Sequence, residues 1–239
     1  MHKMKTQSFL ILKLGLLAGF ILIISSCIKT DQLIAGDAKI KFFNFVNTGV
    51  SKDFYLDSAR YATGVSYGSS VSYTVVPVST FPDGQTYNFR VKNTLKTGTL
   101  PGSLKQLVQV GKNYSVYYTK TKLVNGVQDS LLVIYEDNLK PDPDKAKLIF
   151  LNLGYNLSNK VYIRDENKTY EERLNYNEKT DYKLISIDAK AAKIYMNNVD
   201  SASVIDTISG NNFSKGKIYT ILIDSDKAGK LLKRVLANN

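Results

Sequence analysis

Ser214 and Lys217 stand three residues apart, a spacing at which a lysine can activate a serine nucleophile. That geometry needs a helix, which places the amine beside the hydroxyl. Gly216 lies between the two residues and leads into a run of β-forming residues. The sequence therefore predicts a turn here and no catalytic pair.

Three carboxylates crowd a short stretch that contains two prolines: Asp137, Asp142 and Asp144. Carboxylate oxygens are the ligands that Ca²⁺ prefers. The prolines and the missing Gly-centred calcium-loop spacing argue against a formed site. We expect a solvated linker, with no metal site and no cofactor.

The first 27 residues have the order of an export signal. A short basic start leads into an apolar run over 14–24, and two serines stand directly before Cys27. Residues 24–27 (Ile-Ser-Ser-Cys) resemble the lipobox of bacterial lipoproteins, in which the cysteine is lipidated and becomes the first residue of the mature protein. A membrane-spanning helix would need about 20 apolar residues, and Lys13 keeps this run shorter.

This signal predicts a signal peptide over 1–26, lipidation at Cys27 and a tether over 27–37. The lipid would hold the chain at a membrane, because each buried methylene contributes about 0.8 kcal/mol. The expected location is the cell envelope at the outer membrane, on its periplasmic face or on the cell surface.

Composition excludes several kinds of catalysis. His2 is the only histidine and Cys27 the only cysteine, so a processed and acylated chain has neither a Ser-His-Asp site nor a histidine-ligated zinc site. Carboxylates, lysine and tyrosine remain, and no catalytic residue is predicted. Loss of residues 1–26 takes away Lys3, Lys5 and Lys13 and lowers the net charge from +11 to +8. The remaining lysines are scattered, which favours a solvated surface that attracts anionic glycans or headgroups. No nucleic acid is expected, because a protein outside the cytoplasm rarely meets it.

The chain repeats itself with an offset that drifts from 108 to 105. Residues 38–45 align with 146–153 and keep Ala, Lys, Phe and Asn. The other matching segments are 54–57 with 162–165, Tyr67 and Tyr73 with Tyr176 and Tyr182, and 111–118 with 216–223. The repeat predicts two copies of one domain, over 38–138 and 146–239, joined by a stiff linker over 139–145.

Each copy is expected to be all-β, as an immunoglobulin-like antiparallel β-sandwich. Short runs rich in Val, Ile, Tyr, Phe and Thr indicate strands over 71–78, 87–91, 114–120 and 131–135. Pro82-Asp83-Gly84 and Asn125-Gly126 indicate tight turns.

The 16 tyrosines, without any tryptophan, would suit a sugar-binding platform or ordinary strand positions. Tyr117 and Tyr118 are adjacent, so at most one of them can belong to a given outward patch.

Four Asp-Ser/Thr-aliphatic triplets resemble the acceptor of general O-glycosylation in envelope proteins of Bacteroidota. Their hydroxyls are Ser58, Ser130, Ser201 and Thr207. Composition alone should give roughly one such match, and Asp-Ser is also common in turns. We expect at least one of the four hydroxyls to carry a glycan.

The opening strand (Ala-Lys-Ile-Lys-Phe-Phe-Asn), the Phe54 to Asp57 segment, Tyr67-Gly68 and the late Gly-Lys-Asn-Tyr strand are similar to domain-of-unknown-function family 4397. The resemblance covers nearly all of the expected mature chain. Members of that family occur in tandem behind lipoprotein signals in secreted bacterial proteins, so it implies fold and location but carries no catalytic motif.

Together these features predict a non-enzymatic, membrane-anchored binding or adhesion module, with a glycan or an envelope protein as its partner. An alternative is an accessory or scaffolding subunit of an outer-membrane glycan-uptake or assembly complex. A third is a glycan-active enzyme, which would need two carboxyl groups about 5 to 10 Å apart.

Overall fold

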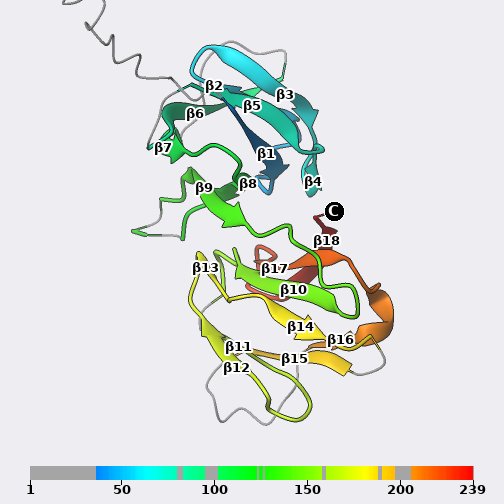
Figure 1. Ribbon diagram of the computed structural model, residues 1–239. Helices are drawn as coiled ribbons and strands as arrows, with labels where there is room; N and C mark the ends of the chain where they lie inside the picture. Colours follow the sequence, from blue (N-terminus) through cyan, green and yellow to red (C-terminus); the bar gives the residue numbers. More distant parts are fainter. Residues whose placement is uncertain are drawn as a thin grey trace, which may run out of the picture. The chain divides into compact units, whose positions relative to one another are not determined.

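The computed structural model describes residues 36–79, 83–94, 102–122, 124–125, 127–157, 160–187, 190–196 and 206–238. They form eighteen strands and one short 3-10 helix, so the all-β prediction is confirmed (Figure 1). The first nine strands are β1 (Gly36–Asn44), β2 (Lys52–Leu56), β3 (Ala59–Val65), β4 (Ser69–Ser70), β5 (Thr74–Val78), β6 (Gln85–Asn93), β7 (Leu104–Val108), β8 (Asn113–Lys120) and β9 (Ser130–Asp137). The others are β10 (Ala146–Asn152), β11 (Val161–Arg164), β12 (Glu171–Leu174), β13 (Glu178–Lys179), β14 (Lys183–Ile185), β15 (Lys190–Met196), β16 (Asp206–Ser209), β17 (Ile218–Ser225) and β18 (Leu231–Ala237), with η1 (Gly210–Asn212) after β16.

The strands make two sandwiches with the same strand order. In the N-terminal sandwich (β1–β9), one sheet has the order β4-β1-β8-β9, with β5 also paired to β1, and the other has the order β3-β2-β6-β7. In the C-terminal sandwich (β10–β18), the orders are β13-β10-β17-β18, with β14 paired to β10, and β12-β11-β15-β16.

The expected antiparallel pairing has one exception in each sandwich. β1 runs parallel to β8, and β10 runs parallel to β17, whereas the other named pairs of the described strands are antiparallel. Parallel neighbours need a long connection, and most of each sandwich lies between these two strands.

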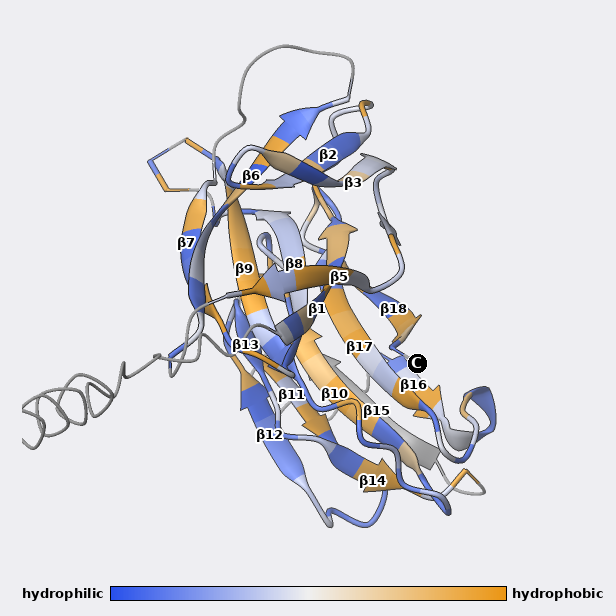
Figure 2. Cartoon of the chain, turned by 45° about the horizontal axis from the view of Figure 1, so that its top comes forward, coloured by the Kyte–Doolittle hydropathy of each residue, from blue (hydrophilic) through white to orange (hydrophobic). Residues whose placement is uncertain are grey.

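Each sandwich encloses its own apolar core. In the N-terminal sandwich, Phe42 and Val116 of one sheet pack in a cluster with Phe54 and Phe89 of the other. In the C-terminal sandwich, the corresponding cluster includes Phe150, Ile221, Val161 and Ile163. Figure 2 shows hydrophobic residues along β9, β10 and β17.

A buried asparagine recurs in both sandwiches. Asn44 donates through Nδ2 to the Val65 carbonyl over 3.0 Å, and its Oδ1 accepts from the Val46 N–H over 3.0 Å. Asn152 makes the corresponding bonds, with Leu174 over 3.1 Å and Gly154 over 3.0 Å. Because a buried amide must satisfy both its donor and its acceptor, this position explains why the repeat keeps an asparagine.

The repeated Gly-Lys-x-Tyr segment is a turn with a tyrosine brace. Gly111 and Gly216 have φ angles of 75° and 72°, in the left-handed region that favours glycine. The Tyr114 hydroxyl accepts from a backbone N–H five residues upstream over 3.2 Å, and the Tyr219 hydroxyl does the same over 3.1 Å. The expected turn over 214–217 is confirmed, since the Lys217 N–H donates to the Ser214 carbonyl.

A third apolar cluster joins the two sandwiches. It is called here the inter-sandwich cluster, and its buried members are Phe43, Phe45, Tyr117, Leu151, Leu153 and Leu222. The rings of Phe43 and Tyr117 stack with their centroids 4.5 Å apart. β1, β8, β10 and β17 are therefore covered on both faces, which explains their continuous apolar runs.

Hydrogen bonds cross between the sandwiches beside this cluster. Tyr135 donates to the Asn177 carbonyl over 2.9 Å, and Lys41 donates through Nζ to the Ala237 carbonyl over 2.8 Å. Tyr118 faces the core of its own sandwich, while Tyr117 lies in the inter-sandwich cluster. Neither tyrosine belongs to an outward patch.

Some strand limits differ from the sequence-based ones. β1 begins at Gly36, within the expected tether, and pairs with β5 from that residue. The expected strand over 71–78 is shorter, because only Thr74–Val78 continues the ladder along β1. The other three predicted strands lie within β6, β8 and β9.

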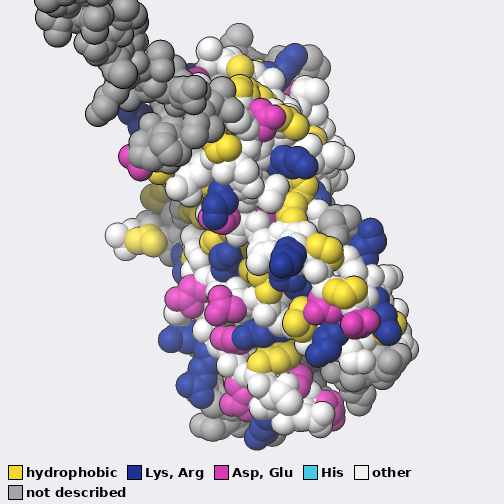
Figure 3. Space-filling model, in the orientation of Figure 1, with side chains coloured by type: hydrophobic (Ala, Val, Ile, Leu, Met, Phe, Trp, Pro, Cys, Tyr) yellow, Lys and Arg dark blue, Asp and Glu magenta, His cyan; other side chains and the backbone are white. Residues whose placement is uncertain are grey.

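The turn predicted at Asn125 is present, with Asn125 at φ 49° between the bridged Val124 and Val127. Pro82 lies outside the described residues. Lysine and arginine side chains are interspersed with aspartate and glutamate over the face shown in Figure 3. In the part of the chain that the structure describes, no helix has the length and apolar character to cross a membrane.

Candidate binding site

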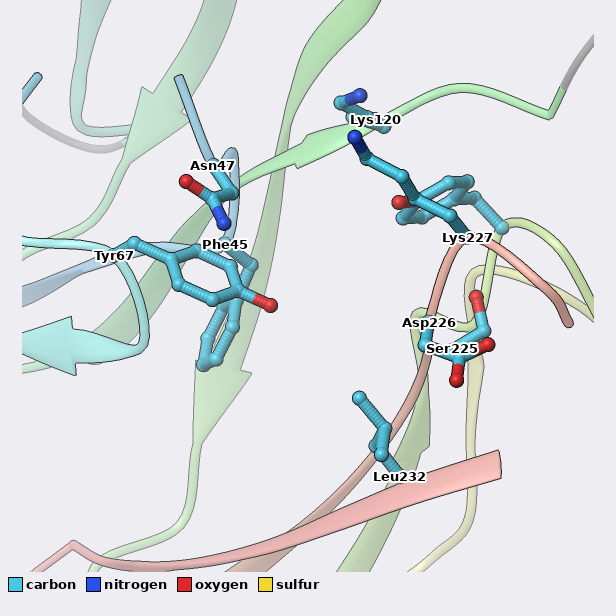
Figure 4. Close-up of a pocket in the computed structure, with 9 residues that line it drawn as sticks. Phe45, Asn47, Tyr67, Lys120, Ser225, Asp226, Lys227 and Leu232 are labelled. Atoms are coloured by element: carbon cyan, nitrogen blue, oxygen red, sulfur yellow. The ribbon is translucent and has the colours of Figure 1, made fainter. Parts of the chain in front are cut away.

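A small cavity of about 170 Å³ opens where loops of the two sandwiches meet (Figure 4). The N-terminal sandwich contributes two residues after β1, the residue before Gly68 and the end of β8. The C-terminal sandwich contributes the loop after β10, the end of β17, the β17–β18 turn and one residue of β18. The lining residues are Phe45, Asn47, Tyr67, Lys120, Tyr155, Ser225, Asp226, Lys227 and Leu232. At about 30 Å³ per water molecule, the cavity suits one ring-sized group.

Aromatic rings form one wall of the cavity. Phe45 is buried, whereas Tyr67 is 39% exposed; the two rings lie close together in Figure 4. Tyr155 is half-buried. Phe45 offers apolar area alone, whereas the two tyrosines offer apolar area together with a polar hydroxyl.

Arg234 of β18 holds this wall in place. Its guanidinium carbon lies 5.2 Å from the ring centroid of Tyr67 and 5.7 Å from that of Phe45. Its Nη2 donates to the Tyr67 hydroxyl over 3.2 Å. On the other side, Arg234 Nε lies 4.0 Å from Oδ2 of the buried Asp224. The Tyr67 ring is thus positioned by a cation of the opposite sandwich.

Two lysines stand at the same rim of the cavity. Lys120 is the last residue of β8, and its Nζ lies 5.6 Å from the Tyr155 ring centroid and donates to Gln128 Oε1 over 3.1 Å. Its carbonyl accepts from the Tyr176 hydroxyl. Lys227 is exposed in the β17–β18 turn. Within the described residues, neither lysine forms an ion pair with a carboxylate.

The floor of the cavity is a turn that is fixed by its own hydrogen bonds. Asp226 Oδ1 accepts from the N–H groups of Ala228 and Lys230, each over 2.9 Å. Asn156 donates through its backbone N–H to Ser225 Oγ over 3.0 Å and through Nδ2 to the Asp226 carbonyl over 3.1 Å. The floor is therefore shaped before any ligand arrives.

Burial changes the titration of two groups beside the cavity. It raises the pKa of the Tyr155 hydroxyl, and the nearby Asp224 adds to this effect. Burial also raises the pKa of Asp224, although the Ser225 N–H and Arg234 oppose the change. Tyr155 therefore presents a neutral hydroxyl, which can donate or accept a hydrogen bond.

These residues can bind a ligand, but they offer no pair for acid-base or nucleophilic chemistry. Ser225 is buried and accepts a backbone hydrogen bond, and Asp226 is the single carboxylate among the lining residues. A second cavity is lined by Glu136 and Asp137. Glu136 is exposed and Asp137 is buried, as expected for consecutive strand residues that point to opposite faces, and Asp137 Oδ2 accepts hydrogen bonds from Ser115 and Tyr73.

The predicted modification residues do not gather at this site. Ser58 is exposed in the β2–β3 turn, Thr207 is exposed on β16, and Ser130 is half-buried at the start of β9. Cys27 and Ser201 lie outside the described residues.

One carboxylate of the linker accepts local hydrogen bonds. Asp142 Oδ1 accepts from the N–H groups of Asp144 and Lys145, each over 2.9 Å, whereas Asp137 is buried. Among the described residues, no three His, Cys, Asp or Glu side chains gather as metal ligands.

Sequence reasoning did not find the cavity. Tyr67 belongs to the repeat and to the family resemblance, whereas Lys120, Tyr155 and Lys227 belong to no motif that indicates a site. The Phe45 and Leu153 N–H groups bond the equivalent carbonyls of β8 and β17. Asn47 and Tyr155 each lie two residues after these N–H groups and are therefore equivalent. Lys120 and Ser225 each lie two residues after the accepting carbonyls of Tyr118 and Ile223 and are equivalent in the same way. Because the copies differ at these positions, a search for repeated residues passes over them.

A family model described as a domain of unknown function (DUF4397) matches residues 38–164. The chain belongs to this family. The DUF4397 match takes in the N-terminal sandwich together with β10 and β11 of the C-terminal one. It includes Phe45, Tyr67, Lys120 and Tyr155 of the cavity.

Two further comparisons give less. A search of curated proteins found no match. Among solved structures, the DUF4397 chain is similar to CBMbc (family CBM26) from Eubacterium rectale Amy13K in complex with maltoheptaose, with 14% identity over 83% of this chain and 96% of that one. The TM-score is 0.26, which is too low to support an argument about ligand.

Proposed function

We propose that this protein is a lipid-anchored component of the bacterial cell envelope that binds a saccharide in the cavity between its sandwiches and does not alter it chemically. The observation that carries the proposal is the cavity itself, in which the exposed Tyr67 ring, the half-buried Tyr155 and two lysines surround a space of about 170 Å³. We further propose that the C-terminal sandwich is a diverged second copy of the family, supported by its equal strand order.

The chemistry of the wall suits a sugar ring. The apolar face of a pyranose can stack on Tyr67, while its hydroxyls meet the Tyr155 hydroxyl, the Asn47 amide and the lysines. Few, well-placed polar groups on an apolar wall are the usual composition of small-ligand sites. Arg234 fixes the Tyr67 ring in advance, so binding does not have to order it.

The anchor places this cavity at a membrane surface. The lipobox-like residues 24–27 and the tether support lipidation of Cys27. We expect Cys27→Ala to remove the protein from the membrane fraction. Intact mass spectrometry should show that the variant lacks the mass of the lipid. An unlipidated wild-type protein would contradict this part of the proposal.

Binding is tested by titration of the purified protein in detergent with a panel of mono- and oligosaccharides, measured by calorimetry. Tyr67→Ala should weaken the binding of any hit about tenfold, because the stacking wall is lost. Tyr55→Ala is the matched control: like Tyr67, which has Arg234 over its ring, Tyr55 has a cation over its ring, Lys92 Nζ at 4.8 Å from the centroid, but it does not line the cavity. Equal weakening by both variants would contradict the proposed site.

The scaffolding alternative gives a different result. If no saccharide binds and the protein co-purifies from native membranes with one fixed partner, the binding proposal is wrong and the scaffolding role is favoured. Product formation from any bound saccharide would contradict the non-enzymatic part.

A further inference from the structure

The strongest unassigned feature of the cavity is the pair of lysines at its rim. Lys120 comes from the N-terminal sandwich and Lys227 from the C-terminal one, and Figure 4 shows their side chains reaching the same side of the cavity. Two like charges that share one rim repel each other, and the repulsion is relieved when an anion lies between them.

Nothing among the described lining residues neutralises this pair. The only lining carboxylate, Asp226, directs Oδ1 to the N–H groups of Ala228 and Lys230. The other acid close by, Asp224, is buried, accepts from the Ser225 N–H over 2.8 Å and lies 4.0 Å from Arg234 Nε. The charge of the two ammonium groups therefore faces the cavity opening.

Lys120 is also held ready for a ligand. One of its three N–H groups donates to Gln128 Oε1 over 3.1 Å, and its Nζ lies 5.6 Å from the Tyr155 ring centroid. An ammonium group has three donors and no acceptor, so two donors remain for a ligand oxygen. The exposed Lys227 supplies a second cation from the opposite sandwich.

We propose, on the basis of the saccharide-binding function above, that the ligand is an acidic saccharide: a sugar ring stacks on Tyr67 while its carboxylate lies between Lys120 and Lys227. The aromatic wall recognises the ring, and the lysines select the charged substituent. Because the lysines belong to different sandwiches, the acidic group also bridges the two halves of the site.

The experiment compares two probes with the same two sugar rings, digalacturonate and its dimethyl ester, in which each carboxylate is replaced by a neutral ester, titrated into the full-length protein by calorimetry. The acid should bind at least tenfold more tightly than the ester, and added salt should weaken the acid alone, because screening acts on the charge pair. Lys120→Gln and Lys227→Gln should each remove most of this preference. Lys92→Gln, at the ring of Tyr55, should leave it unchanged.

The outcomes separate the two proposals. Tyr67→Ala should weaken both probes alike. If acid and ester bind equally and the lysine variants change neither, the acidic-sugar inference is wrong while saccharide binding stands. If other saccharides also fail to bind, the proposed function is wrong as well. If glycerol 3-phosphate binds as tightly as digalacturonate with the same lysine dependence, the site is for a phosphate headgroup and the inference is overturned.

Discussion

Ser115 donates through Oγ to Oδ2 of Asp137 over 2.7 Å, inside the boundary between the two sandwiches. Tyr73 donates to the same oxygen over 2.9 Å. The equivalent pair of the C-terminal sandwich is Thr220 and Asn238, 2.9 Å apart. One copy thus has a carboxylate where the other has an amide, and the carboxylate makes this boundary sensitive to pH.

Asp137→Asn should gain stability relative to wild type as the pH rises. Burial raises the pKa of Asp137, although Ser115, Tyr73, Lys179 and Lys41 oppose the change. Since the folded pKa lies above the unfolded one, the stabilising effect of protonation is complete below about pH 4 and is lost as the pH rises through the folded pKa. Urea unfolding of both proteins between about pH 3 and 7 measures the difference.

Asp53→Asn is the control with the opposite sign. Burial alone would raise the pKa of Asp53, but hydrogen bonds from Thr94, Gly64, Thr63 and Arg60 lower it overall. The contribution of its ionised form is therefore lost as the pH falls through the folded pKa, so this variant should lose stability relative to wild type as the pH rises. A difference that does not depend on pH for Asp137→Asn would contradict the prediction.

Asn44→Ala and Asn152→Ala should each lower the free energy of unfolding by about 2 kcal/mol, since each leaves a buried carbonyl and a buried N–H without a partner. Asn47→Ala, at an exposed position three residues after Asn44, should change it by less than about 0.5 kcal/mol. Chemical denaturation gives the values. Equal effects at positions 44 and 47 would show that the repeated asparagine has no structural role.

The sequence predicted the strands well where local pattern decides them. β8 and β9 follow from β-branched and aromatic runs that end at turn residues. Asn44 and Asn152 were visible as repeated residues, and their hydrogen bonds give the reason. These features depend on residues close in the chain or on identity between the copies.

The cavity and the boundary between the two sandwiches depend neither on residues close in the chain nor on identity between the copies. A continuous apolar run such as the one around Leu222 indicates a strand covered on both faces, but it does not say what covers the second face. The cavity combines loops far apart in the sequence, and its equivalent positions differ between the copies, as Lys120 and Ser225 do. Only the folded chain brings them together.

Leu222→Ala should lower the free energy of unfolding by about 3 kcal/mol, as expected for a buried leucine whose removal leaves a cavity. Leu222 is fully buried in the inter-sandwich cluster. Because this cluster couples the sandwiches, we expect one cooperative transition in wild type and in the variant. Val235→Ala, at an exposed position of β18, is the control and should change stability by less than about 0.5 kcal/mol. Two separate transitions in wild type would contradict the coupling.

Glycosylation should occur at Ser58 or Thr207 rather than at Ser130. Ser58 is exposed in a two-residue turn and Thr207 is exposed on β16, whereas Ser130 is half-buried where β9 begins. A transferase needs access to the hydroxyl, which favours the two exposed positions. Intact mass spectrometry of the native mature protein should exceed polypeptide plus lipid, and the combined Ser58→Ala and Thr207→Ala variant should lose most of the excess, while Ser130→Ala keeps it. A native mass equal to polypeptide plus lipid alone would refute glycosylation at any of these hydroxyls.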